Sequence, residues 1–545
     1  MKKIISVVCI FLLILLLLSS CNYQQGEQSL DDNIQPEQRK DIQDTGPVKG
    51  GTLNLYSLNP DTLNPLFTKS KSNAEILNLV FNSLIIYDKN MNVFPSLAER
   101  WEVSPDGMTW TFFLRKDVKW HDNAQFTAND VDYTFKVLSS SKYDSIYKFN
   151  IQFVSYFSVV DEYTFKVVLT QPYGNFLEMM TFPIVAKHQF QGKELDGNTP
   201  DFKPIGTGPF KFVKYDPLKE LRLKVNTAWW GENVPYIEDI IVKLVPDNNT
   251  ALYALEAKEI DLVPTNVVDW EKYSGKGNIK IKEFITNYYE FIAVNFNNKV
   301  LSDKAVRKAI AYAIDRNKII NEVLLNHAKK SDVPVNPESW LYDPSSQIYD
   351  YDIQKAKEIL NGAGWNDLNN DGVLDKVIDG VNMSLSFEII TNNDNVIRDK
   401  AATIIENQLK AVGMNVTVKK VAWNELNSIL NSKNFDAVLS GLNLFPNSDL
   451  SFAFHSSEIE RGTNFISYNN PQMDELLQQA FKAVDKEQRR QAYSLLQKQI
   501  AEELPYISLY FRTSAVLYND RLRGDVNPIG TNIYNNIHKW YLLKE

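Results

Sequence analysis

One segment carries side chains of the types, and near the spacing, that bind a metal ion. Oxygen-bearing residues alternate with others from residue 367 onward, and Gly372 stands at the sixth position, as in the first half of a calcium-binding loop. The candidate ligands are Asp367, Asn369, Asp371 and Asp375. The twelfth position, where such a loop places a bidentate Glu, is Ile378. Because Asn, Asp and Gly also dominate turns, calcium binding and a plain turn both stay open. No other metal or cofactor is predicted.

Enzymatic motifs are missing from the sequence. It has no G-x-S-x-G nucleophile elbow, no H-E-x-x-H zinc motif and no phosphate-binding G-x-x-x-x-G-K-[ST] loop. Gly206 and Gly208 are followed by Pro209 and a strand-like run, so they predict a structural turn. The five histidines (His121, His188, His327, His455 and His538) are widely scattered, and His121 and His455 are interpreted as structural. The sequence therefore predicts a protein that is not an enzyme.

The composition is that of a folded protein with an acidic surface. The chain has 545 residues, 44% of them hydrophobic, and a formal net charge of −9. An acidic protein without a basic stripe is not expected to bind nucleic acid. Its two cysteines, Cys9 and Cys21, cannot form a disulfide framework.

The N-terminus predicts export and membrane attachment. Lys2 and Lys3 precede a 15-residue apolar run at 4–18, which is shorter than a bilayer span. The following Leu-Ser-Ser-Cys21 resembles a bacterial lipobox, which implies cleavage after a signal peptide of residues 1–20 and lipidation of Cys21. An uncleaved membrane helix ending near Ser20 is the alternative. Residues 21–48 are polar and predict a flexible tether. Both interpretations place the rest of the chain on the extracytoplasmic face of the cell membrane.

Strand and helix signals alternate along the remaining chain. Alternating residues predict strands at 51–56 and 108–114, the second preceded by an Asp106-Gly107 turn. Capping residues predict helix starts at Thr127, Ser302 or Asp303, Asp315 and Asp485. Such a mixture indicates α/β or α+β domains.

Several ordered blocks make the chain resemble a known family. The segment 98–131, which includes Trp101, Asp106-Gly107, Trp120-His121-Asp122 and Thr127, is similar to the signature of the family 5 solute-binding proteins, the receptors of peptide and nickel ABC importers. Further matching blocks follow in order at 204–210, 294–297, 306–316, 454–457, 468–477 and 505–510.

This resemblance implies an α/β, two-lobed fold of the periplasmic-binding-protein kind (type II, large cluster), with an extra α+β domain inserted in the first lobe. The lobes are expected to close on ligand about crossings near residues 294–298 and 508–512. The expected parts are lobe I at 49–80, 204–293 and 511–545, an inserted domain at 81–203, and lobe II at 294–510.

The resemblance also implies a function and a site. It predicts a monomeric lipoprotein that captures peptides between its lobes and delivers them to the membrane subunits of an ABC permease. A receptor for a sugar, opine or metal complex is the alternative, and an extracellular hydrolase is a further one. Peptide receptors of the family hold the ligand amine with an Asp a few residues after the position of Gly441, where this chain has Phe445, and Asp449 is the nearest acid. The implied ligand-binding positions are Tyr56, Ser57, Asn59, Trp423, Leu439, Ser440, Gly441, Leu442, Asn443, Asp449 and Tyr510.

Overall fold

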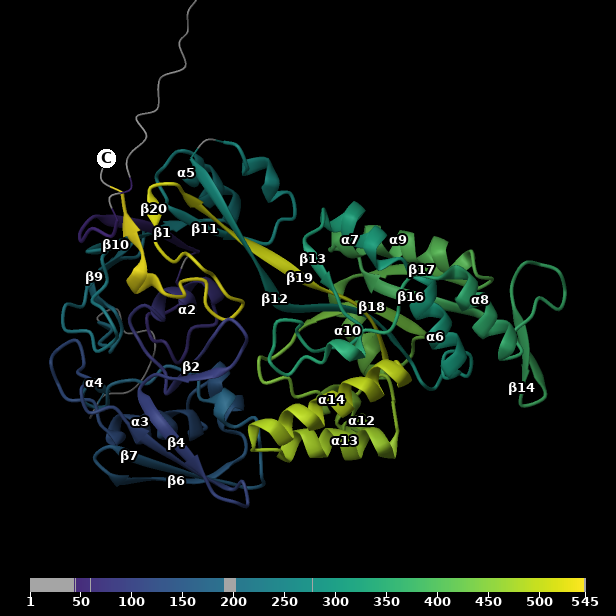
Figure 1. Cartoon of the computed structure of the whole chain (residues 1–545), viewed down its shortest axis with the longest axis horizontal. Coiled ribbons are helices and arrows are strands. Elements are labelled where there is room, and N and C mark those ends of the chain that lie inside the picture. Colours follow the sequence, from purple (N-terminus) through teal and green to yellow (C-terminus); the bar gives the residue numbers. More distant parts are fainter. Residues whose placement is uncertain (1–43, 45, 59, 191–201, 277, 544–545) are drawn as a thin grey trace, which may run out of the picture. The chain divides into compact units, whose positions relative to one another are not determined.

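The computed structural model describes residues 44–543, apart from residues 45, 59, 191–201 and 277. Helices and strands alternate along this part of the chain (Figure 1). The predicted leader, Cys21 and residues 21–43 of the predicted tether lie outside the described residues. Within the described part, no helix is both long and apolar enough to cross a membrane.

A four-stranded sheet, in the order β1-β10-β9-β8, contains the predicted N-terminal strand. β1 pairs with β10 in parallel, and the other pairs are antiparallel. The strands are β1 (Thr52–Leu58), β8 (Phe210–Asp216), β9 (Glu220–Val225) and β10 (Asp239–Val245). β8 follows Pro209 directly, so the Gly206–Pro209 segment is a turn into a strand, as the sequence predicted.

A second, antiparallel sheet is built by residues 81–203 in the order β4-β5-β7-β6. The Asp106-Gly107 turn joins its first two strands, and Thr127 caps α3 in a reciprocal capping box with Asp130. The elements are β4 (Ala98–Val103), β5 (Thr109–Leu114), α3 (Ala128–Ser139), the 3₁₀ helix η1 (Ile146–Ile151), β6 (Val154–Asp161), β7 (Thr164–Leu169), η2 (Leu177–Met179) and α4 (Lys187–Phe190).

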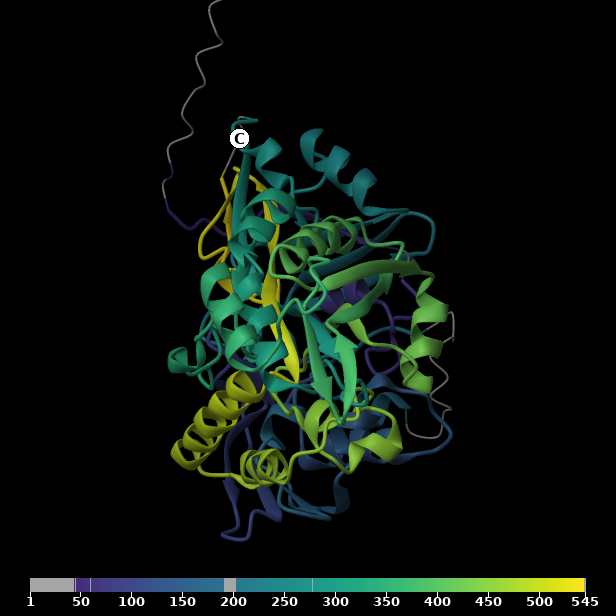
Figure 2. The same cartoon turned by 90° about the vertical axis from the view of Figure 1, so that its right-hand side faces the viewer.

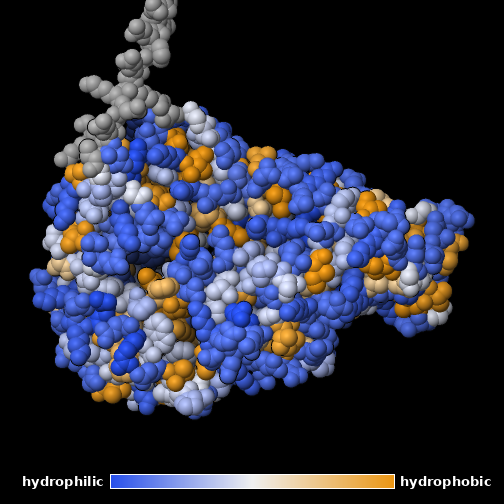
Figure 3. Space-filling model, viewed as in Figure 1, coloured by the Kyte–Doolittle hydropathy of each residue, from blue (hydrophilic) through white to orange (hydrophobic). Residues whose placement is uncertain are grey.

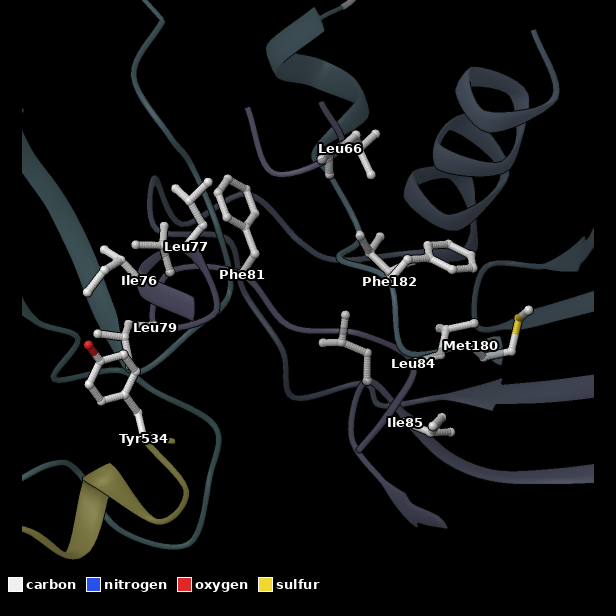
Figure 4. Packing of buried hydrophobic residues seen from close by; sticks show 14 of the residues in the cluster. Leu66, Ile76, Leu77, Leu79, Phe81, Leu84, Ile85, Met180, Phe182 and Tyr534 are labelled. Carbon is white, nitrogen blue, oxygen red and sulfur yellow. The ribbon is translucent and has the colours of Figure 1, made fainter. Parts of the chain in front are cut away.

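These two sheets share one hydrophobic core. Figure 4 shows part of this core: Leu66 lies next to Phe182, and Ile76 and Leu77 lie beside Phe81. His121 fastens the same junction, because its Nδ1 accepts the Gly206 N–H at 3.2 Å and its Nε2 lies 3.0 Å from the Gly208 carbonyl. The described part of residues 81–203 is therefore packed continuously onto the first sheet.

The third large sheet has seven strands, in the order β11-β19-β12-β18-β16-β17 with β13 beside β19. The strands are β11 (Leu262–Thr265), β12 (Ile279–Val294), β13 (Ala328–Lys330), β16 (Ser386–Asn392), β17 (Asn415–Val421), β18 (Ala437–Asn443) and β19 (Tyr506–Asn519). The helices around it are α5 (Asn248–Glu256), α6 (Lys304–Ala313), α7 (Arg316–Leu324), α8 (Ile353–Gly362), α9 (Val396–Lys410), α10 (Trp423–Ser432), α11 (Ser451–Phe454), α12 (Glu458–Arg461), α13 (Pro471–Lys482) and α14 (Lys486–Glu503). The remaining elements are α2 (Lys71–Leu77), η3 (Trp270–Tyr273), η4 (Pro344–Ser346), η5 (Ile537–Lys539) and the hairpins β2–β3 (Ile85–Tyr87, Val93–Pro95), β14–β15 (Asp375–Ile378, Val381–Ser384) and β20–β21 (Leu522–Arg523, Tyr541–Leu542).

Alternating side chains of this sheet face two separate cores. Ile292 and Val294 of β12 belong to the core that α6–α9 cover, whereas Phe291 and Ala293 belong to the core covered by α10, α11, α13 and α14. We call the elements around these two cores the second lobe. The elements around the shared core of Figure 4, and around a small cluster under α5, are called the first lobe. Asp303, Asp315 and Asp485 cap their helices as predicted.

Two long strands connect the lobes. β12 and β19 pair side by side, but their register shifts between Ile285 and Tyr289, opposite Arg512 (Figure 1). β12 contributes to the first lobe before the shift and to the second lobe after it. β19 runs antiparallel to β12, so it contributes to the second lobe before the shift and to the first lobe after it. The sequence placed one crossing at 508–512, close to this shift, and the other at 294–298, which lies at the far end of β12. The register shift marks where the strands bend from one lobe into the other.

Candidate functional site

Strand β18 has an edge that its neighbours cover only in part. It pairs with β12 over its full length, but with β16 only at Ala437 and Val438. β16, β17 and β18 are parallel to one another, so their carboxyl ends meet at one border of the sheet. In open α/β sheets this border is where ligands bind.

The direction of the main-chain groups shows which of them are free at this edge. The Leu444 N–H donates to Asn287 of β12, and the Leu439 carbonyl accepts from Thr391 of β16. Successive residues of a strand direct these groups to opposite edges. The N–H and C=O groups of Gly441 and Asn443 therefore face the uncovered edge, where an extended chain could pair with them.

A buried ion pair lies directly beneath Gly441. Arg398, in the first turn of α9, donates from Nε to Glu290 at 2.9 Å, and the two side chains are 2% and 0% exposed. A Cβ on residue 441 would lie 2.6 Å from the Arg398 guanidinium and 2.8 Å from the Glu290 carboxylate. Only glycine therefore allows the pair to approach this strand so closely.

Neighbouring polar groups hold the Arg398 guanidinium in place. It donates to the Asn392 side chain at 2.8 Å and to the Tyr288 hydroxyl at 2.9 Å. Burial raises the pKa of Glu290, and the positive charge of Arg398 opposes that shift. The ion pair holds both side chains in place beneath the open edge, because either charge would be strongly disfavoured there without the other.

An aromatic pair stands just beyond the end of β18. Phe445 stacks on Phe149 of η1, with 5.2 Å between ring centroids and 18° between planes. Both rings remain accessible, with exposed fractions of 56% and 41%. Figure 3 shows hydrophobic residues in several places among hydrophilic ones on one face of the molecule.

The second lobe also touches residues 81–203 along what we call the α13–α14 seam, formed by residues 173–178 against 481–493. Figures 1 and 2 show α13 and α14 lying against this part of the first lobe. The Gly174 N–H donates to the Phe481 carbonyl at 2.7 Å, and a Cβ on Gly174 would lie 1.9 Å from the Ala483 carbonyl. Arg489 donates to Glu178 at 2.5 Å, with side chains only 7% and 4% exposed.

The chain matches the family model described as bacterial extracellular solute-binding proteins, family 5 (middle), over residues 92–460. It belongs to the family 5 extracellular solute-binding proteins. The oligopeptide-binding protein AppA of Bacillus subtilis is 30% identical over 560 residues, which cover 100% of this chain and 99% of that protein. The dipeptide-binding protein of Escherichia coli is 26% identical and covers 88% of this chain and 92% of its own length.

Solved structures agree with the architecture of this family 5 protein. AppA from Bacillus subtilis in complex with a nonapeptide has a TM-score of 0.66 at 30% identity, with 92% of this chain and 100% of that chain covered. HbpA2 from Haemophilus parasuis has a TM-score of 0.79 at 25% identity, with 90% and 100% covered. The two-lobed α/β fold expected from the sequence is confirmed, as is the role of a solute-binding protein of the ABC-importer type.

The positions that the resemblance implied as ligand contacts fall into two groups. Gly441, Leu442 and Asn443 lie on the uncovered part of β18, while Leu439 and Ser440 lead into it and are buried. Tyr510 lies opposite Glu290 on β19 and is 1% exposed, and Trp423 begins α10 with 44% of its surface exposed.

The predicted contacts in β1 are engaged within the first lobe. Tyr56 packs in the cluster under α5, and its hydroxyl donates to Asn248 at 3.1 Å. The Ser57 hydroxyl donates to the neighbouring Leu58 carbonyl at 2.9 Å. Asn59 lies outside the described residues. The structure therefore does not bring Tyr56 and Ser57 together with the edge of β18.

The carboxylate of Asp449 also has a hydrogen-bond partner of its own. Its carboxylate accepts the Ser451 N–H at 3.0 Å at the start of α11. Burial raises the pKa of this carboxyl group. Because the side chain is half-buried and already engaged, it does not supply a free negative charge beside Phe445.

Sequence reasoning missed Arg398, Glu290 and Tyr288. A signal existed for one of them, since Glu290 interrupts the apolar run from Tyr288 to Val294. A charge in such a run has to find a buried partner. The partner could not be named, because Arg398 is 108 residues away and only the fold brings it under β18.

The calcium candidate folds as a turn. The Asp367 carboxylate accepts the N–H groups of Asp371 and Gly372, and Asn369 accepts from Asp371 as well. Asp375 begins the β14 strand and is buried. Among the residues that the structure describes, no three His, Cys, Asp or Glu side chains lie close enough to share a metal ion. The turn interpretation is therefore the one that the structure favours.

His121 is a structural residue. Its contacts at the first-lobe junction match a neutral ring that accepts at Nδ1 and donates at Nε2. Burial lowers its pKa to about 4, so the ring stays neutral near pH 7.

A cavity of about 780 Å³ is lined by first-lobe residues such as Phe94, Trp229 and Trp230, and not by β18.

Proposed function

We propose that this protein captures peptides as an added strand along the open edge of β18 and delivers them to an ABC permease. The observation that carries the proposal is the pair of unpaired residues, Gly441 and Asn443, at the carboxyl border of the parallel strands. Main-chain pairing gives affinity without reading sequence. The similarity to AppA and to the dipeptide-binding protein supports peptides as the ligand class.

The protein binds and releases its ligand without chemistry. His121, which lies in the segment that resembles the family signature, is engaged in the junction of the first lobe. Closure would come from bending at the register shift of β12 and β19. In this proposal the chain acts as a monomer whose two lobes move relative to each other. The parts expected from the sequence are lobe I at 49–80, 204–293 and 511–545, the inserted domain at 81–203, and lobe II at 294–510.

Membrane attachment belongs to the same proposal. The apolar run at 4–18 followed by Cys21 favours a lipid anchor on the extracytoplasmic face, with residues 21–48 as the tether. An anchored receptor stays close to its permease, which raises the local concentration of the complex.

Replacing Cys21 with alanine is expected to release the folded protein from the membrane. The tether is not basic, so no second signal would hold the protein there. The distribution between membrane and soluble fractions measures this, with Cys9→Ala as the control that should stay attached. A Cys21→Ala protein that is processed yet remains in the membrane fraction would contradict lipidation at this residue.

Replacing Asn443 with proline is expected to weaken peptide binding about fivefold. Proline removes the N–H that faces the open edge, and the loss of one such bond costs about 1 kcal/mol. The ladder to β12 stays intact, because the N–H of Asn443 does not face that strand.

The measurement is calorimetric titration with a peptide recovered from the wild-type protein. Asn443→Ala keeps the N–H and should bind within about twofold of wild type. Equal affinity of a correctly folded Asn443→Pro variant would rule out pairing at this edge.

A further inference from the structure

The open edge of β18 leads directly to the aromatic pair Phe149–Phe445. Asn443 ends the strand, and Phe445 follows two residues later with more than half of its surface accessible. A peptide strand longer than the uncovered part of the edge would pass this pair with one of its ends, whichever direction it runs. The pair therefore lies where one end of such a peptide would contact the protein.

On the η1 side, the surface next to the pair is apolar. Ile146 and Phe149 are three residues apart in the 3₁₀ helix η1, so their side chains lie on the same side of it. Ile146 is 53% exposed, which makes Ile146, Phe149 and Phe445 one accessible apolar patch. Contiguous exposed apolar groups on an otherwise hydrophilic surface mark binding sites.

The charged groups nearest along the chain do not suit a terminal ammonium group. Asp449, the first acid after Phe445, is engaged by the Ser451 N–H. Lys148, the neighbour of Phe149 on η1, is positive and disfavours an ammonium group there. A terminal ammonium group brought against the two rings would lose water without gaining a partner.

We propose that Phe149 and Phe445 form a subsite for an apolar residue at one end of the bound peptide, and that no terminal ammonium group is held there. This inference rests on the proposed function and refines its ligand class. Peptides with a hydrophobic terminal residue would bind, and neutralising an amino terminus at the subsite would not weaken them. Because the subsite joins a ring from each lobe, such a residue would also favour the closed arrangement.

The test uses a random hexapeptide library in three forms: unmodified, N-acetylated and C-amidated. The purified protein captures peptides from each, and mass spectrometry reads the captured sequences. We expect at least threefold enrichment of Phe, Leu, Ile, Val, Met, Trp and Tyr at one terminal position. Where the enriched position is the amino terminus, N-acetylation should change capture by less than threefold.

Two matched variants test whether the Phe149–Phe445 pair causes the preference for an apolar terminal residue. Phe445→Asp should abolish the terminal enrichment, whereas Val377→Asp makes the same charge change on an exposed side chain of the β14–β15 hairpin and should retain it. No enrichment in the wild type, unchanged enrichment in Phe445→Asp, or a larger loss on N-acetylating an enriched amino terminus would each overturn the inference. Failure to capture any peptide would instead reject the proposed function itself.

Discussion

Replacing Glu290 with alanine is expected to lower the free energy of unfolding by about 3–5 kcal/mol. The substitution leaves the Arg398 guanidinium buried without its counter-charge, and breaking a buried pair in this way costs that amount. Urea denaturation followed by tryptophan fluorescence measures the loss. The same variant should also lose peptide affinity, because Arg398 would move out from under Gly441.

The control removes both charges at once. Glu290→Leu combined with Arg398→Leu eliminates the burial of charge, and such replacements are often neutral or stabilising. We therefore expect the double variant to be within about 1 kcal/mol of the wild type or better. A cost below about 1 kcal/mol for Glu290→Ala alone would show that the pair does not support the strand edge.

Replacing Glu178 with alanine is expected to open the α13–α14 seam and to weaken peptide binding about a hundredfold. Arg489 would lose its ion-pair partner within a contact that is almost entirely buried. The core of residues 81–203 is continuous with the first lobe, whereas α13 and α14 belong to the second. Opening the lobes therefore has to break this seam, and a cost of about 3 kcal/mol to the closed state reduces apparent affinity by about that factor.

Small-angle scattering and calorimetric titration test the seam together. The Glu178→Ala protein should have a larger radius of gyration with peptide than the wild type. Lys486→Ala, which removes the exposed 2.9 Å contact to Asn92 at the same border, should change affinity by less than twofold. If Glu178→Ala compacts on peptide and binds as tightly as wild type, the seam does not control closure.

The fold could be predicted well because its signals are local or shared with a family. Thr127, Asp303, Asp315 and Asp485 each cap the helix that follows them, since capping depends on residues only two or three positions apart. The first crossing was harder to place. The register shift at Ile285–Tyr289 depends on pairing with β19, more than 200 residues away, and leaves no local signature.

The site could be predicted only in part. Gly441 and Asn443 were predicted through resemblance, and in the structure they lie on the edge that is left open because β16 stops pairing with β18 after Val438. Tyr56 was also implied as a contact, yet its ring packs under α5 and its hydroxyl bonds to Asn248. The Phe149–Phe445 pair joins residues 296 positions apart, so no pattern in the sequence could have indicated it.

The most direct test of the account is mass spectrometry of the ligand released when protein purified from its native host is denatured. If the open edge of β18 binds extended main chains, the released material will be intact peptides of mixed sequence, in stoichiometric or lower amounts. The Asn443→Pro variant should retain far less of the same material. Release of a sugar, an opine or a metal complex in place of peptides would contradict the central claim, as would cleavage of added peptides by the purified protein.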